Sequence, residues 1–237
     1  MLELNAVEVR FKDRTTLQIP HLRFEEGHTY GIIGENGSGK TTLLRLLAGT
    51  LAPTSGQVLS SVSRDNLAYL PQSPYSFSFS VLRNVSMGLP RSAERKTRAT
   101  EALAKVGLSE LAGARGDRLS GGEAQRMGLA RVIALPRRCL ILDEPTSATD
   151  IRGMDRIETV LREYARETGC LLIFSTHAPA QALRLAEEVI FLEKSQLVEM
   201  GSASQLLRHP QDERTRSFLK HWQLGGVGGT EPVGEAR

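Results

Sequence analysis

One short segment constrains this chain of 237 residues more than any other: the sequence GENGSGKT over residues 34–41. An apolar run, residues 29–33, precedes it, and a Leu-rich stretch over residues 41–48 follows and stops at Gly49. The pattern predicts a buried strand, a glycine-rich loop and a helix, which is the order of a phosphate-binding loop, or P-loop. A glycine-rich turn without a ligand is the alternative, and these flanking segments make it the weaker one.

The residue types of this loop suit a nucleoside triphosphate. Successive backbone N–H groups can converge on phosphate oxygens, and the N-terminus of the helix adds partial positive charge. Lys40 would reach the β- and γ-phosphates, and the Thr41 hydroxyl would ligate Mg²⁺. The expected ATP contacts of this segment are Gly34, Glu35, Asn36, Gly37, Ser38, Gly39, Lys40, Thr41 and Thr42.

Two carboxylates, Asp143 and Glu144, follow the apolar run over residues 139–142. In open α/β sheets, ligands bind at the carboxyl ends of the strands. Asp143 could hold Mg²⁺, and Glu144 could polarise the water that attacks the γ-phosphorus. The alternative is a solvated acidic pair, which the P-loop in the same chain makes less attractive.

The segment Leu119–Glu123, with the sequence LSGGE, permits two interpretations. Ser120 and Glu123 have the spacing of a capping box, so the segment could simply begin a helix. However, Gly121 and Gly122 would each cost a helix about 1 kcal/mol relative to alanine. The two glycines therefore indicate a close approach to a ligand, at a second helix N-terminus that can bind an anion.

The chain thus has two phosphate-binding helix starts but one Lys–Thr set and one Asp–Glu pair. A simple resolution is that LSGGE serves a neighbouring molecule. Two copies facing each other would form two composite sites, and this arrangement is an isologous two-fold dimer.

Strand and helix patterns alternate along the chain and predict an α/β fold with a mostly parallel sheet. Alternating apolar residues before residue 25 predict a small antiparallel β part. We expect residues 1–72 and 136–210 to form the ATP-binding core. Residues 73–135 would form an inserted helical subdomain that carries LSGGE, and residues 211–237 a tail with a disordered, Gly-rich end.

Composition limits the possible partners. The net charge of +3 is too small to indicate nucleic acid, while the isoelectric point of about 9.0 is compatible with an anionic ligand or a membrane surface. Cys139 and Cys170 each begin an apolar run and predict buried, reduced thiols. No apolar stretch approaches the ~20 residues that span a bilayer, so we expect any membrane role to be exercised from the water side.

With these motifs in this order, the sequence resembles the ATP-binding subunit of ABC transporters over roughly residues 2–210. Phe11 falls where the family has an aromatic residue that stacks on adenine. Gln72 matches the glutamine that senses Mg²⁺ and the attacking water, and His177 the histidine that contacts the γ-phosphate. Ser147 and Asp150 match the loop that crosses the dimer interface.

The resemblance implies ATP and Mg²⁺ as cofactors and a homodimer that forms on ATP binding. It implies Glu144, His177 and Gln72 as catalytic residues, and Thr41, Gln72 and Asp143 as metal ligands. LSGGE would contact the ATP of the partner chain through Leu119, Ser120, Gly121, Gly122 and Glu123.

The resemblance also implies transmembrane permease subunits, an extracytoplasmic solute-binding protein acting indirectly, and a place at the cytoplasmic face of the membrane. Residues 73–90 would form much of the permease contact, although their Phe77, Phe79 and Val81 could equally form a locally buried loop. The segments SVLRNVSMGL and ERTRSFL are most similar to subunits that import small inorganic anions such as tungstate or molybdate.

Two other functions stay open at this stage. One is a soluble ABC-type mechanical ATPase, for example in iron–sulfur cluster assembly, which fractionation of cells would distinguish. The other is a nucleotide-binding module without turnover, and the presence of both Lys40 and Glu144 argues against it.

Overall fold

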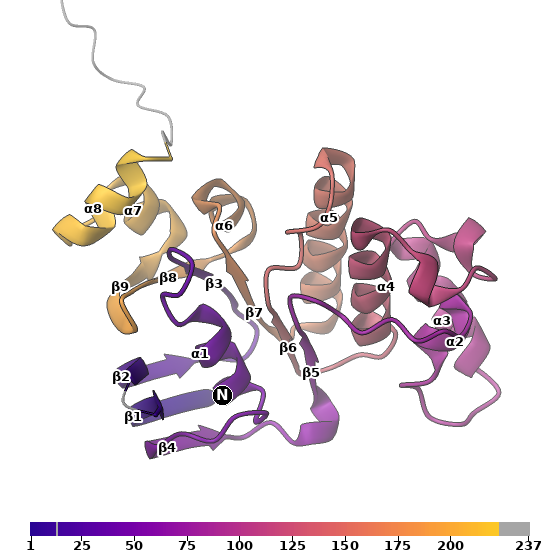
Figure 1. The fold of residues 1–237 in the computed structure, drawn as a ribbon, viewed down its shortest axis with the longest axis horizontal. Coiled ribbons are helices and arrows are strands. Elements are labelled where there is room, and N and C mark those ends of the chain that lie inside the picture. The colour runs from indigo at the N-terminus through magenta and orange to yellow at the C-terminus, as the bar shows by residue number, and fades with distance from the viewer. Residues whose placement is uncertain (13, 223–237) are drawn as a thin grey trace, which may run out of the picture.

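The computed structural model describes residues 1–12 and 14–222. Within them, nine strands form one sheet in the order β4-β1-β2-β9-β8-β3-β7-β6-β5 (Figure 1). The strands are β1 (Leu2–Phe11), β2 (Arg14–Phe24), β3 (Thr29–Ile33), β4 (Ser55–Ser60), β5 (Leu67–Leu70), β6 (Cys139–Leu142), β7 (Leu171–Thr176), β8 (Glu188–Glu193) and β9 (Gln196–Ser202). The helices are α1 (Lys40–Leu47), α2 (Val81–Ser86), α3 (Arg95–Lys105), α4 (Gly121–Ile133), α5 (Ile151–Thr168), α6 (Pro179–Leu185), α7 (Ala203–Arg208) and α8 (Glu213–Lys220).

Strands β5, β6, β7, β3 and β8 are parallel neighbours and form the centre of the sheet. Their side chains alternate between two cores. Cys139 and Ile141 face the core that contains α1, and Leu140 and Leu142 face the core that contains α4 and α5. Because helices cover both faces, most residues of these strands are apolar. The α/β fold with a mostly parallel sheet is therefore confirmed.

The antiparallel part is continuous with this centre. β1 pairs with β2 and β4 in the antiparallel sense, as the alternating N-terminal pattern predicts. The join is β9, which is antiparallel to β8 and meets β2 at the pair Gln18–Gln196. There the Gln18 N–H donates to the Ser195 carbonyl at 2.7 Å. The sequence analysis did not predict β9, so it gave no link between the two parts.

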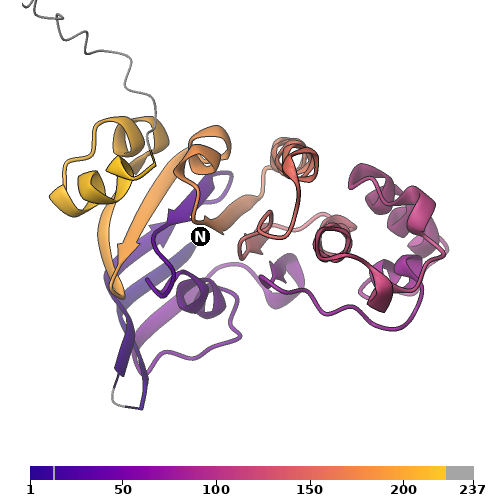
Figure 2. The ribbon, with the colours of Figure 1, turned by 45° about the horizontal axis from the view of Figure 1, so that its top comes forward.

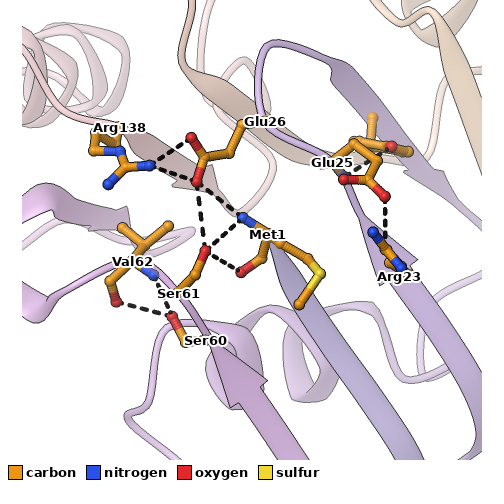
Figure 3. A network of polar contacts seen from close by, with 9 residues as sticks. Met1, Arg23, Glu25, Glu26, Ser60, Ser61, Val62 and Arg138 are labelled. Atoms are coloured by element: carbon orange, nitrogen blue, oxygen red, sulfur yellow. Dashed lines mark hydrogen bonds and ion pairs between the residues drawn. The ribbon is translucent and has the colours of Figure 1, made fainter.

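A polar cluster also joins the two parts near the N-terminus (Figure 3). Glu26 accepts hydrogen bonds from Arg138 at 2.6 and 2.7 Å and from the α-amino group of Met1 at 3.1 Å. The same amino group donates to Ser61 Oγ at 2.9 Å. These bonds lower the pKa of Glu26 to about 2, with that from Arg138 contributing most. The cluster connects β1, the end of β4, the β2–β3 turn and the start of β6.

Helices α2, α3 and α4 pack together within residues 73–135 and lie at the opposite end of the molecule from β1, β2 and β4 (Figures 1 and 2). Residues 73–79 form no helix or strand, and the short helix α2, which was not predicted, follows them. The Asn84 side chain is fully buried and donates to the carbonyls of Phe77, Phe79 and Ser80. It therefore fixes the course of the aromatic stretch before α2.

The C-terminal part adds a helix that the sequence analysis did not predict. Within the tail that begins at residue 211, α8 packs Phe218 against Phe191 of β8, with ring centroids 4.9 Å apart. The expected disorder at the end of the tail falls on residues 223–237, outside the described residues. Cys139 and Cys170 are buried and unpaired, as expected, and burial raises the pKa of Cys139 to about 12. Among the described helices, none is long and apolar enough to cross a bilayer.

Candidate nucleotide site

The P-loop lies between β3 and α1, as predicted. Gly34 has φ of 150°, and a Cβ there would lie 2.2 Å from the Leu192 carbonyl oxygen, so this position requires glycine. Gly39, with φ of 106°, is the N-cap residue of α1, and Lys40 is the first residue of that helix. The loop thus turns sharply against β8 and then leads into the N-terminus of α1.

A cleft of about 480 Å³ lies over this loop. The residues that line it are Arg14, Thr16, Asn36, Gly37, Gly39, Lys40, Thr41, Thr42, Gln72, Glu144 and Ser195. Most of these residues were predicted from the sequence, but Arg14 and Thr16 of β2 and Ser195 of the β8–β9 turn were not. Nothing in their local sequence indicates a ligand, because the sheet brings them to the loop from distant positions.

Lys40 is buried, and its ammonium group faces the cleft. Its Nζ donates to the Gly34 carbonyl at 2.8 Å and to the Glu35 carbonyl at 3.0 Å, and lies 4.0 Å from Glu144 Oε1. Burial lowers the pKa of Lys40, and the charges of Glu144 and Asp143 offset part of that effect. A polyanion in the cleft would compensate this desolvated cation further.

Asp143 is 1 % exposed and directly precedes Glu144, which lines the cleft. Its Oδ1 accepts a hydrogen bond from Ser175 Oγ at 2.7 Å, and the same hydroxyl accepts one from the Glu144 N–H at 2.9 Å. Ser175 therefore positions both residues of the acidic pair, a role that the sequence analysis missed. Asp143 Oδ2 is buried and has no hydrogen-bond partner within the described residues. A buried carboxylate oxygen of this kind calls for a cation or a donor.

The Glu144 carboxylate is where the other predicted catalytic residues meet. Gln72 Nε2 donates to Glu144 Oε2 at 3.1 Å, and His177 Nδ1 lies 3.6 Å from the same oxygen. Lys40 approaches the other oxygen. Residues that follow β5 and β7, together with Lys40 of the P-loop, therefore converge on one carboxylate that follows β6 and lines the cleft.

The LSGGE segment begins α4 with the capping box that its spacing predicts. Ser120 Oγ accepts from the Glu123 N–H, and Glu123 Oε2 accepts from the Ser120 N–H at 2.8 Å. Hydrogen bonds from Ser120 lower the pKa of Glu123. A Cβ on Gly122 would lie 3.0 Å from the Ala148 carbonyl oxygen, so this glycine also has a packing reason within its own chain. Gly121 has no such close neighbour.

Segment 119–123 contributes no residue to the lining of the P-loop cleft. It lies instead against the loop at residues 147–150, where Asp150 caps α5 by accepting from the Gly153 N–H at 2.8 Å. Phe11 is not part of the lining either. Its side chain is 51 % exposed, and it pairs across β1 and β2 with Arg14, which does line the cleft.

The comparisons with known proteins agree on one family. The family model described as ABC transporter matches residues 17–147. The Methionine import ATP-binding protein MetN 2 of Staphylococcus epidermidis is 32% identical over 245 residues, covering 93% of this chain and 71% of that protein. The Tungstate uptake system ATP-binding protein TupC of Peptoclostridium acidaminophilum is 35% identical over 195 residues, covering 78% of this chain and 91% of that protein.

A solved structure of an ATP-binding cassette has the same fold as this chain. A dimeric ATP-binding cassette in a post-hydrolysis state, bound to ADP and Pi, superposes with a TM-score of 0.78 at 25% sequence identity. The match covers 86% of this chain and 99% of that one. The chain therefore belongs to the ABC transporter family, as one of its ATP-binding ATPase subunits.

Proposed function

We propose that this chain hydrolyses ATP at sites shared between two copies and drives solute import through separate permease subunits. The observation that carries the proposal is the convergence of Lys40, Gln72 and His177 on the Glu144 carboxylate beside the P-loop. A carboxylate held at the phosphate end of the cleft can accept a proton from an attacking water.

The residues around this carboxylate would have different roles in binding and hydrolysis. The backbone N–H groups of residues 34–41 and the Lys40 ammonium would hold the β- and γ-phosphates. Glu144 would act as the general base, with Gln72 keeping its carboxylate oriented toward the water. His177, which lies beside Glu144 Oε2 while Lys40 lies beside Oε1, would also contact the γ-phosphate.

Mg²⁺ fits the residues present. Within the described residues, no group of three His, Cys, Asp or Glu side chains is arranged to hold a metal ion. Magnesium, however, is usually held by one or two carboxylates together with substrate phosphates and water. The unpartnered Asp143 Oδ2, the Thr41 hydroxyl and the Gln72 amide oxygen would supply the protein's share. When bound, the ion neutralises charge on the β- and γ-phosphates.

We assign the second half of each site to the partner copy. Leu119, Ser120, Gly121, Gly122 and Glu123 would contact the partner's ATP, and Ser147 and Asp150 would cross between the copies. Two observations support this assignment. Segment 119–123 does not line the P-loop cleft of its own chain, and the ATP-binding cassette that superposes on this chain is dimeric. The adenine would stack on Phe11, which is exposed and pairs with Arg14, a residue that lines the cleft.

The surface offered to a permease would be the segment over residues 73–90. Phe79 and Met87 are exposed there and line a groove of about 630 Å³ whose rim carries Arg83, Arg91, Arg95 and Lys96. Docking at this groove would hold the subunit at the cytoplasmic face of the membrane, and a solute-binding protein would act on the opposite side. No specific observation favours the soluble ATPase alternative, and the two relatives above are named as ATP-binding proteins of methionine import and of a tungstate uptake system.

For the solute, we propose an inorganic oxyanion such as tungstate or molybdate, supported by the resemblance to TupC. Cells that lack this gene should lose uptake of labelled tungstate or molybdate, and the wild-type gene should restore it. A defect in methionine uptake with normal oxyanion uptake would instead assign the substrate of the MetN relative.

Glu144→Gln tests the proposed mechanism. The variant should bind ATP and accumulate as an ATP-bound dimer in size-exclusion chromatography, while its kcat falls by ~10²- to 10⁴-fold, as loss of a general base predicts. Glu163→Gln, an exposed position on α5, is the matched control and should keep wild-type turnover. Wild-type turnover in Glu144→Gln would show that another group is the base.

A further inference from the structure

A second cleft, of about 360 Å³, adjoins the first at its phosphate end. Asn36, Gln72 and Glu144 line both clefts. The remaining wall of the second cleft includes His177 and the aromatic side chain of Trp222, which follows α8. The C-terminal helix is thereby brought to the site at which the γ-phosphate is expected, although none of its residues belongs to a recognised motif.

Trp222 is anchored to the sheet through a series of aromatic rings. Phe191 of β8 stacks on Phe218 of α8, and the Phe218 ring lies 6.3 Å from that of Trp222. The start of α8 is fixed as well, because Glu199 of β9 accepts a hydrogen bond from the Asp212 N–H at 3.2 Å. The indole is therefore held by the same sheet that carries the P-loop.

His177, in contrast, has few restraints of its own. It lies in the short loop between β7 and α6, and its side chain is 53 % exposed. Its one charged neighbour among the described residues is Glu144, 3.6 Å away. Its aromatic partner is Trp222, whose ring centroid lies 6.2 Å from that of the imidazole at an interplanar angle of 47°. Without the indole, the imidazole could rotate away from the cleft into solvent.

We propose that Trp222 is a positioning residue for His177: its indole forms the wall that keeps the imidazole facing Glu144 and the P-loop. The inference rests on the role proposed above for His177. A large, rigid aromatic ring restricts a neighbouring ring while losing little conformational freedom of its own. Because a displacement of ~1 Å at a reacting group can cost ~10²-fold in rate, this restraint would act on the chemical step.

A double-mutant cycle tests the proposal. Trp222→Ala should lower kcat by ~5- to 10-fold and leave the KM for ATP within ~2-fold, since the contact affects the reaction more than ground-state binding. Trp222→Phe, which keeps an aromatic wall, should retain at least about half of the wild-type kcat. In the His177→Ala background, Trp222→Ala should cause no further loss beyond ~2-fold, because the two residues act as a unit.

Trp222 is the only tryptophan of the chain, so the intact protein gives a second readout. Fluorescence is measured in Glu144→Gln, to prevent turnover, during titration with MgATP. As His177 turns to the phosphate, the indole emission should change. The change should disappear in Glu144→Gln/His177→Ala while equilibrium dialysis still detects bound ATP. His21→Ala, an exposed position on β2, is the control and should keep the change.

The outcomes separate the two proposals. Additive losses in the cycle, an unchanged kcat in Trp222→Ala, or a kcat above wild type would overturn the positioning role while leaving the proposed function intact. A fluorescence change that persists without His177 would do the same. Wild-type turnover in His177→Ala would overturn the proposed role of His177 and, with it, that of Trp222.

Discussion

Glu144 adopts a left-handed backbone conformation, with φ of 45°, that residues other than glycine rarely occupy. Such a conformation costs on the order of 1–3 kcal/mol and persists only where the surrounding structure imposes it. Here the Ser175 hydroxyl accepts from the Glu144 N–H, and the buried Gln125 side chain donates to the Glu144 carbonyl. The strain is stored at the residue to which the proposed function assigns the chemistry.

Gly34→Ala should destabilise the fold by about 3 kcal/mol or more, because the new Cβ would collide with a backbone oxygen of β8. Gly37→Ala is the matched control. Gly37 also has a positive φ, of 80°, but a Cβ there meets nothing within 4 Å, so the cost should be only the conformational ~1–2 kcal/mol. Urea unfolding of both variants measures the difference. Equal losses would mean that the approach to β8 does not constrain the loop.

Two kinds of signal predicted residues of the site: the spacing of local motifs and, for Gln72 and His177, the resemblance to a known family. Lys40 and Thr41 belong to a local motif, and Glu144 follows a strand that composition makes evident. Ser175 and Ser195 have no such signal, since their roles come from the pairing of β6 with β7 and from the β8–β9 turn. Phe11 was inferred from resemblance, and its stacking role stays a prediction.

Among the elements, strands buried on both faces were the most predictable. β6 and the first four residues of β7 appear as uninterrupted apolar runs because cores lie on both of their faces. β9, in contrast, is only half-buried, and its role as the join between β2 and β8 depends on a pairing that no local pattern indicates. The short helix α8 is rich in charged residues, and its placement depends on the distant Phe191.

The Glu26 cluster links elements that are far apart in the chain, and its stabilising effect should depend on pH. The pKa of Glu26 is about 2 in the fold and 4.5 ordinarily, so its contribution is fully present above pH 4.5 and is lost as the pH falls toward 2. Glu26→Gln should lower stability at pH 7 by about 1 kcal/mol at most, because the pair is largely exposed.

Thermal unfolding of Glu26→Gln and wild type between pH 7 and pH 2 measures this dependence, and the two curves should converge near pH 2. Glu101→Gln, an exposed position on α3, should follow the wild type at every pH. A constant difference between Glu26→Gln and wild type would show that the carboxylate charge is not what stabilises the cluster.

The helix that begins at the P-loop and the helix that begins at LSGGE pack in different cores of the molecule. α1 begins at the P-loop and packs in one core. α4 begins at LSGGE, beside the loop at residues 147–150, and packs in another core. In the arrangement proposed above, one P-loop and one LSGGE segment per chain would form two pockets in a pair of copies. The sequence could predict the need for a second copy from the count of motifs, but only the fold shows that segment 119–123 is absent from the lining of its own chain's cleft.

The structure of Glu144→Gln loaded with MgATP tests this division most directly. Each γ-phosphate should lie between the P-loop of one copy and Ser120, Gly121 and Gly122 of the other. A triphosphate that touches segment 119–123 of its own chain, or that is bound with no second copy beside it, would rule out the proposed shared site.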